Sequence, residues 1–175
     1  QHPHVQERLE AEIDEVLDGR PPEYQDLANL HYLRMVIDEA LRLYPPAWGV
    51  SREALADDVL GGYRLPRGWL AFVIPYVLHR LPAYWPDPER FDPERFSPER
   101  SAERPKFVYI PFGAGPRQCI GNQFALIETQ LSVATFAQAY RLRLVPGHKV
   151  DPWPLITLRP RFGMPMIVER RQRNC

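Results

Sequence analysis

The sequence predicts a mainly α protein with a small β component. Three observations lead to this expectation: helical periodicity over residues 5–17, 30–43 and 122–140, several short β-like runs, and a proline-rich stretch between them. With 175 residues, 45% of them hydrophobic and 25% charged, the chain has the length and composition of about one globular domain.

The two helices expected in the first third of the chain differ in how they are buried. Val5–Leu17 has apolar residues on one face and is flanked by a proline and a glycine, which are start and stop signals. Leu30–Leu43 is apolar around much of its circumference, so we expect it to be deeply buried. Asn29 is its expected N-cap, and the YPP sequence at 44–46 ends it.

The β-like runs lie in the middle and at the end of the chain. DVLGGYRLPRG predicts a hairpin that turns at Gly61–Gly62, and WLAFVIPYVL predicts an extended segment up to Pro75. After the last helix we expect three further runs, at Arg141–Val145, Leu155–Leu158 and Met164–Val168.

Residues 82–105 contain too many prolines for a helix or a central strand, so they predict a meander. Four aromatic residues favour a packed coil over a flexible linker: Tyr84, Trp85, Phe91 and Phe96. We divide the chain into one partial domain, 1–175, with a meander at 82–110 and a cysteine loop at 111–121. Because residue 1 lies at the threshold of a helix, we expect the sequence to be a piece of a longer protein.

Charge and hydropathy exclude several classes of partner. Lys plus Arg and Asp plus Glu both total 22, so bulk charge gives no reason to expect nucleic acid or anionic lipid. No stretch reaches the ~20 apolar residues of a membrane span. We expect a cytoplasmic location, and leave open an anchor upstream of Gln1. The two cysteines, Cys119 and Cys175, are too few for a disulfide framework.

PFGAGPRQCIG, residues 111–121, is the most informative stretch. It is not a dinucleotide fingerprint, because Gln118 stands where a third glycine is needed, and it lacks the Lys-Ser/Thr of a phosphate-binding loop. The five histidines are scattered, which argues against a zinc site. A nucleophilic cysteine paired with His31 or His79 stays open, although no local signature of cysteine proteases is present.

The loop favours a thiolate at Cys119. The residue precedes a predicted helix, whose N-terminus favours negative charge, and Arg117 adds a nearby cation. Gly113, Gly115 and Gly121 would allow positive φ and close approach of a flat, bulky group. These points leave two interpretations open: a ligand for a metal cofactor, or a small hydrophobic cysteine buried in a glycine loop.

The loop resembles the haem-ligand loop of the cytochrome P450 family, the haem-thiolate monooxygenases. All fixed positions of Phe-x-x-Gly-x-Arg-x-Cys-x-Gly are filled, by Phe112, Gly115, Arg117, Cys119 and Gly121. EALR, residues 39–42, resembles the family's Glu-x-x-Arg motif, and WPDPERFDPERF resembles its proline-rich coil. The resemblance implies a truncated P450-like fold in which Glu39, Arg42 and Arg95 form a cluster.

The resemblance also implies the cofactor site. Cys119 would be the catalytic residue and axial ligand of a haem b iron, bordered by Phe112 and by the glycines at 113, 115 and 121. Arg117 and Arg52 would bind the haem propionates. His79 is expected near the cofactor, with a packed, hydrogen-bonded histidine as the favoured alternative.

The function implied is a monooxygenase that oxidises a small apolar organic substrate with electrons from a donor protein. Ala47, Trp48 and Gly49 would touch the substrate. Sequence neighbours of the loop suggest a cationic rim that attracts an acidic donor: Arg104, Lys106, Arg117, Arg141 and Arg143.

Alternatives remain open at this stage. They are a non-catalytic haem-thiolate module or inactive truncation, and a relative that uses or rearranges peroxides. The resemblance covers residues 1–169 but only the C-terminal portion of the family's fold, and the distal helix with an acid-alcohol pair has no counterpart here.

Overall fold

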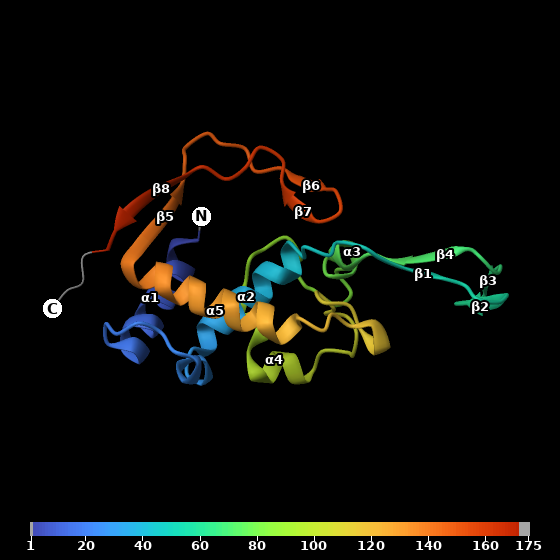
Figure 1. The fold of residues 1–175 in the computed structure, drawn as a ribbon, viewed down its shortest axis with the longest axis horizontal. Coiled ribbons are helices and arrows are strands. Elements are labelled where there is room, and N and C mark those ends of the chain that lie inside the picture. Colours follow the sequence, from blue (N-terminus) through green and yellow to red (C-terminus); the bar gives the residue numbers. More distant parts are fainter. Residues whose placement is uncertain (1, 172–175) are drawn as a thin grey trace.

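The computed structural model describes residues 2–171. Three helices form the body: α1 (Pro3–Leu17), α2 (His31–Leu43) and α5 (Asn122–Ala139). A long hairpin extends from one end of this body, and a second β region covers one side of it (Figure 1). The helical body and the small two-stranded sheets agree with the predicted mainly α class.

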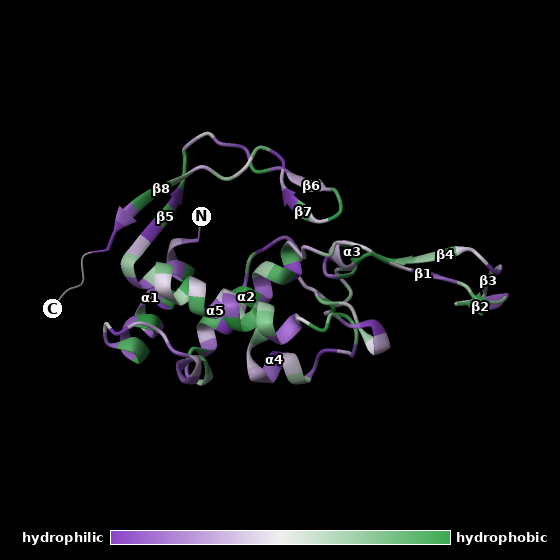
Figure 2. Cartoon of the chain, in the orientation of Figure 1, coloured by the Kyte–Doolittle hydropathy of each residue, from purple (hydrophilic) through white to green (hydrophobic). Residues whose placement is uncertain are grey.

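The core lies where these helices meet. The predicted helix at 5–17 is confirmed, and it starts slightly earlier because Pro3 occupies its first turn, where the missing N–H costs nothing. Apolar residues, green in Figure 2, occur in all three helices, and those that face inward form one cluster. Its buried members are Val5, Leu9, Ile13, Leu17, Leu30, Tyr32, Leu33, Ile37, Leu126 and Ala134.

The start of α2 corrects the expected cap. Asn29 ends the preceding 3₁₀ helix η1 (Tyr24–Ala28) and does not cap α2. The amides of Tyr32 and Leu33 instead donate to the Glu12 carboxylate of α1, at 2.6 and 2.8 Å. A carboxylate placed by tertiary packing therefore satisfies the N–H groups that a local cap would otherwise serve.

The protruding arm contains two antiparallel pairs. β1 (Val50–Glu53) pairs with β4 (Leu70–Val73), and β2 (Asp58–Leu60) pairs with β3 (Tyr63–Leu65). The predicted turn is confirmed, because Gly61 and Gly62 have φ of 58° and 86°, as a tight hairpin requires. After β4, Pro75 starts the short helix α3 (Pro75–Leu78).

Four strands follow α5. β5 (Tyr140–Leu144) pairs with β8 (Met166–Arg170), and β6 (Pro152–Pro154) pairs with β7 (Leu158–Pro160). The run expected at Leu155–Leu158 is wrong as a strand, since 155–157 form the turn between β6 and β7. Its apolar composition is typical of a strand, but the residues on either side of it, 152–154 and 158–160, form the antiparallel pair.

The meander packs as expected but also contains two short helices that the prolines did not suggest. They are the 3₁₀ helix η2 (Pro93–Phe96) and α4 (Pro98–Ala102), each with proline in its first turn. Asp92 and Ser97 cap them. Trp85 is only 1% exposed, which agrees with a packed coil, whereas Tyr84 is exposed.

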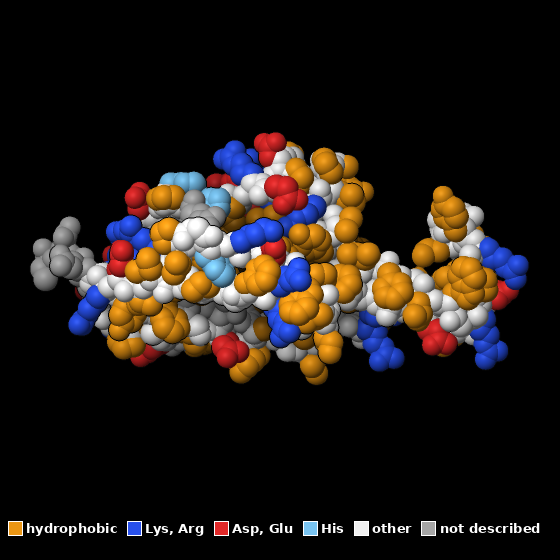
Figure 3. Space-filling model, turned by 90° about the horizontal axis from the view of Figure 1, so that it is seen from above, with side chains coloured by type: hydrophobic (Ala, Val, Ile, Leu, Met, Phe, Trp, Pro, Cys, Tyr) orange, Lys and Arg blue, Asp and Glu red, His pale blue; other side chains and the backbone are white. Residues whose placement is uncertain are grey.

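Much apolar surface is exposed, as the orange side chains on the face in Figure 3 show. Phe124 and Phe136 stand out from α5, and Trp69, Leu70 and Phe72 are exposed on the arm. Soluble monomers seldom expose so many large apolar side chains, so these surfaces suit contact with further polypeptide.

Candidate functional site

Backbone hydrogen bonds close the cysteine loop upon itself. The Cys119 amide donates to the Phe112 carbonyl at 3.0 Å, and the Gln118 amide donates to the Gly115 carbonyl at 3.0 Å across the 3₁₀ turn η3 (Gly115–Arg117). The Cys119 side chain is exposed. The loop therefore fixes the backbone on which the thiol stands and leaves the thiol accessible.

Two of the three loop glycines have the predicted conformation. Gly113 and Gly115 have φ of 74° and 69°, which ordinary residues rarely adopt. Gly121 corrects the expectation, because its φ is −86° and it is the N-cap of α5. A Cβ added at Gly121 would lie 3.9 Å from Cys119 Sγ, so the missing side chain leaves space beside the sulfur.

Glu39 and Arg42 lie together on the buried side of α2, and both have no exposed surface. Arg42 Nε and Nη2 donate to the two carboxylate oxygens of Glu39 at 2.6 and 2.9 Å. Two further N–H groups of Arg42 donate to the carbonyls of His79 and Arg90, at 2.7 and 3.2 Å. Each of the three nitrogens of the guanidinium thus has at least one acceptor, which offsets the cost of burying the ion pair.

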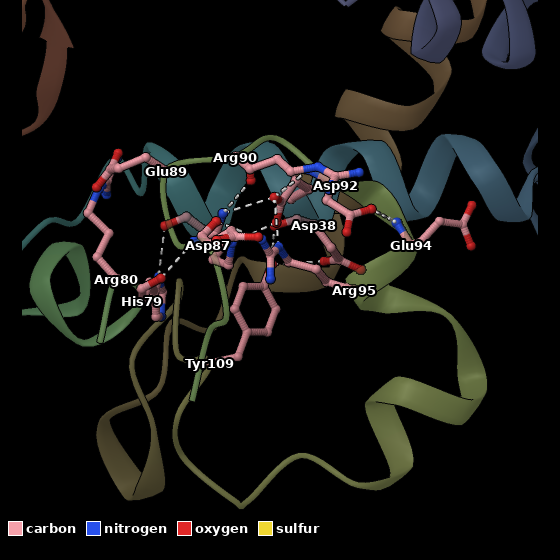
Figure 4. A network of polar contacts seen from close by, with 12 residues as sticks. Asp38, His79, Arg80, Asp87, Glu89, Arg90, Asp92, Glu94, Arg95 and Tyr109 are labelled. Carbon is pink, nitrogen blue, oxygen red and sulfur yellow. Dashed lines mark hydrogen bonds and ion pairs between the residues drawn. The ribbon is translucent and has the colours of Figure 1, made fainter. Parts of the chain in front are cut away.

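Arg95 completes the predicted cluster from η2, as the dashed contacts in Figure 4 show. Its Nε lies 3.5 Å from Glu39 Oε1, and its Nη2 donates to the Asp87 carbonyl at 2.8 Å. The third hydrogen bond to Glu39 comes from the Asp92 amide, not from Arg95. Burial lowers the pKa of Arg95, because removal from water disfavours the charged guanidinium; the neighbouring Arg42 cation lowers it as well, whereas the Glu39 carboxylate raises it.

His79 is fully buried beside this cluster. Its Nδ1 donates to the Arg42 carbonyl at 3.2 Å, and its Nε2 accepts the Ile110 amide at 2.9 Å, so the ring is neutral with its proton on Nδ1. Burial lowers its pKa to about 4. Both ring nitrogens are bonded within the protein and the residue has no exposed surface, which favours the packed, hydrogen-bonded alternative over contact with a cofactor.

The expected cationic rim is largely wrong. Arg141 and Arg143 pair with acidic residues of α1 and β8, at the opposite end of α5 from the loop, about 27 Å away at 1.5 Å per residue. Arg104 is half-buried over two aromatic rings of the meander. Lys106 and Arg117 remain exposed. Arg141 and Arg143 follow the loop closely in the sequence, but the length of α5 separates them from it in space.

Comparison with known proteins assigns the family. The family model described as Cytochrome P450 matches residues 1–164. The chain belongs to the cytochrome P450 family. It is 48% identical over 146 residues to cyclooctat-9-en-7-ol 5-monooxygenase of Streptomyces melanosporofaciens, which covers 83% of this chain and 32% of that protein.

Two other relatives match a similar part of the chain. Cyclooctatin synthase of Streptomyces melanosporofaciens is 46% identical over 157 residues, 90% of this chain and 34% of the relative. Thromboxane-A synthase of Mus musculus is 43% identical over 151 residues, 85% of this chain and 28% of the relative. The chain spans about a third of the length of these curated relatives.

Membership of the P450 family implies a haem cofactor, and the loop fits one. Cys119 presents an accessible soft donor, and the glycine at 121 leaves the space beside it open. Within residues 2–171, no group of three His, Cys, Asp or Glu side chains could hold a metal ion.

The two predicted propionate ligands are exposed, and they lie in different elements. Arg117 is in η3, two residues from the cysteine, whereas Arg52 lies on β1 opposite Ala71. Arg52 donates to the Ser51 carbonyl at 2.7 Å. The cavity that Arg52 lines is formed by residues of the arm alone.

The structure brings together two segments that sequence reasoning treated separately. Trp48 Nε1 donates to the Leu155 carbonyl at 2.7 Å, and the Leu158 amide donates to the Pro46 carbonyl at 2.9 Å. The β6–β7 turn thus lies beside 46–48 and presents Ile156, which is 99% exposed. No local signal in the sequence predicts this contact.

None of the helices in residues 2–171 is both long and apolar enough to cross a bilayer.

Proposed function

We propose that this chain is the haem-binding C-terminal part of a monooxygenase that uses haem b to oxidise an apolar organic substrate. The observation that carries the proposal is the exposed Cys119, held by its amide in a loop whose residues fill the fixed positions of the P450 ligand motif. The cyclooctat-9-en-7-ol 5-monooxygenase of Streptomyces melanosporofaciens, 48% identical, supports this reaction class.

The loop residues would bind the cofactor through distinct contacts. Cys119 would ligate the iron as a thiolate, with Phe112 and the three glycines forming the surface around it. Arg117, which makes no ion pair within the described residues, and Arg52 would offer guanidinium groups to the propionates. When bound, a thiolate-ligated haem supplies oxygen activation that favours O–O cleavage.

The substrate would meet the joined segments at 46–49 and 155–157. Ala47, Trp48 and Gly49 were expected to touch it, and the hydrogen bond from Trp48 to Leu155 adds the β6–β7 turn to the same wall. Ile156 extends this wall with an almost fully exposed apolar side chain. Apolar surface of this kind selects for an apolar substrate and excludes water.

An acidic electron-donor protein would approach the loop side. Lys106, just before the loop in the sequence, and Arg117, within it, are exposed cations that would steer an oppositely charged donor. A cytoplasmic location stays a prediction from sequence.

The ligand can be tested in the full-length protein loaded with haem. Only thiolate ligation gives the long-wavelength Soret band of the reduced carbon monoxide complex, so Cys119→Ser is expected to abolish that band. Cys175→Ser, which lies outside the described residues, is the matched control and should retain it. A band that persists in both variants would refute Cys119 as the ligand.

A further inference from the structure

The segment that leads into the cysteine loop, residues 108–110, is held from two sides. The Tyr109 hydroxyl hydrogen-bonds the Asp38 carbonyl and carboxylate of α2, both at 3.0 Å. On the next residue, the Ile110 amide donates to His79 Nε2 at 2.9 Å. The His79 and Tyr109 rings also lie close together, tilted by 40° with 5.3 Å between centroids, and Figure 4 shows both residues in the same network as Asp38.

A continuous set of hydrogen bonds runs from Ile110 to Cys119. The Gly113 amide donates to the Ile110 carbonyl at 3.0 Å, which closes the turn that carries Phe112. The Phe112 carbonyl then accepts the Cys119 amide at 3.0 Å. The position of Ile110 therefore fixes the turn whose carbonyl holds the backbone of Cys119.

At its other end, His79 is joined to the Glu39–Arg42 pair in both directions. Arg42 Nη1 donates to the His79 carbonyl, and His79 Nδ1 donates to the Arg42 carbonyl. Neither residue has exposed surface, so water cannot replace these bonds without local opening. The position of the ring therefore depends on α2, and the ring in turn holds the backbone of residue 110.

We propose that His79 is a positioning residue for the haem ligand: its Nε2 holds the Ile110 amide and so sets where Cys119 stands relative to α2. The proposal rests on the proposed function, since it concerns the same thiol. The bond to Ile110, not the bulk of the ring, carries the effect.

Two amide variants separate the two ring bonds. In His79→Gln the side-chain oxygen reaches the site of Nε2 and can accept a hydrogen bond from the Ile110 amide. In His79→Asn the shorter side chain can only donate to the Arg42 carbonyl. Each variant loses one buried hydrogen bond, so both should lower the melting temperature similarly. Leu17→Ala, a cavity in the core on α1, is the control for loss of stability alone.

The first measurement needs no haem. In the full-length protein, amide hydrogen exchange at Ile110 and Cys119 should be about tenfold faster in His79→Asn than in His79→Gln, as expected when one buried hydrogen bond is lost. The second uses the haem-loaded protein: His79→Asn should convert part of the long-wavelength Soret band of the carbon monoxide complex to the short-wavelength form. His79→Gln and Leu17→Ala should keep the band.

The outcomes are decisive. Equal exchange rates and equal spectra in the Gln and Asn variants would overturn the proposal, as would a Leu17→Ala protein that loses the band to the same extent. If Cys119→Ser retains the band, the proposed ligand has failed, yet the exchange measurement still decides whether His79 holds the loop.

Discussion

Removal of the Glu39 carboxylate is expected to be among the most damaging single changes in the chain. Glu39 accepts three hydrogen bonds, two from Arg42 and one from the Asp92 amide, and it makes the one ion pair found for Arg95 in the described residues. Glu39→Ala leaves two buried guanidinium groups without a carboxylate. Breaking a buried pair by removing one partner costs about 3–5 kcal/mol.

That loss is a large share of the stability of an ordinary domain, about 5–15 kcal/mol. For a chain of this size it corresponds to a fall of roughly 6–20 °C in melting temperature. The assay is thermal and urea unfolding, followed by circular dichroism, together with the yield of soluble protein.

Arg64→Ala is the matched control, because it breaks an exposed pair with Asp57 and should cost at most about 1 kcal/mol. A soluble Glu39→Ala protein that unfolds at the same temperature as the unaltered protein would refute the buried network.

Three further predictions follow from the same geometry. His79 has a folded pKa of about 4 against an ordinary value of 6.5, so the unfolded state binds more protons between these pH values. The free energy of unfolding should therefore fall by about 3 kcal/mol in total as the pH falls through this range. Urea titrations at several pH values should show this slope, and His79→Gln should flatten it. Gly113→Ala forces a side chain to φ +74° and should lower the free energy of unfolding in urea by about 1–2 kcal/mol. Gly49→Ala, in open space without positive φ, should avoid that strain, and an equal loss of stability in both variants would contradict the conformational argument. Lys106→Glu should slow reduction of the haem-loaded protein by an acidic donor, most at low salt, whereas Arg143→Glu, at the far end of α5, should not. Equal stopped-flow reduction rates for the two variants would argue against the steering role.

Local patterns in the sequence determined much of this protein. The periodicity of 5–17 predicted α1, the Gly61–Gly62 pair predicted the hairpin, and the spacing around Cys119 indicated the family. Each of these signals is contained in a short window, where backbone conformation and side-chain direction follow from the residues themselves.

The tertiary structure decided which distant groups satisfy which buried ones. The first amides of α2 donate to the carboxylate of Glu12, some 20 residues earlier in the chain, although Asn29 stood at the expected N-cap position. His79 binds the Ile110 amide across 31 positions, and the β6–β7 turn joins Trp48 across 107. Buried polar groups must find partners wherever packing brings one within reach, so their pairing depends on the complete fold and leaves no periodic trace in the chain.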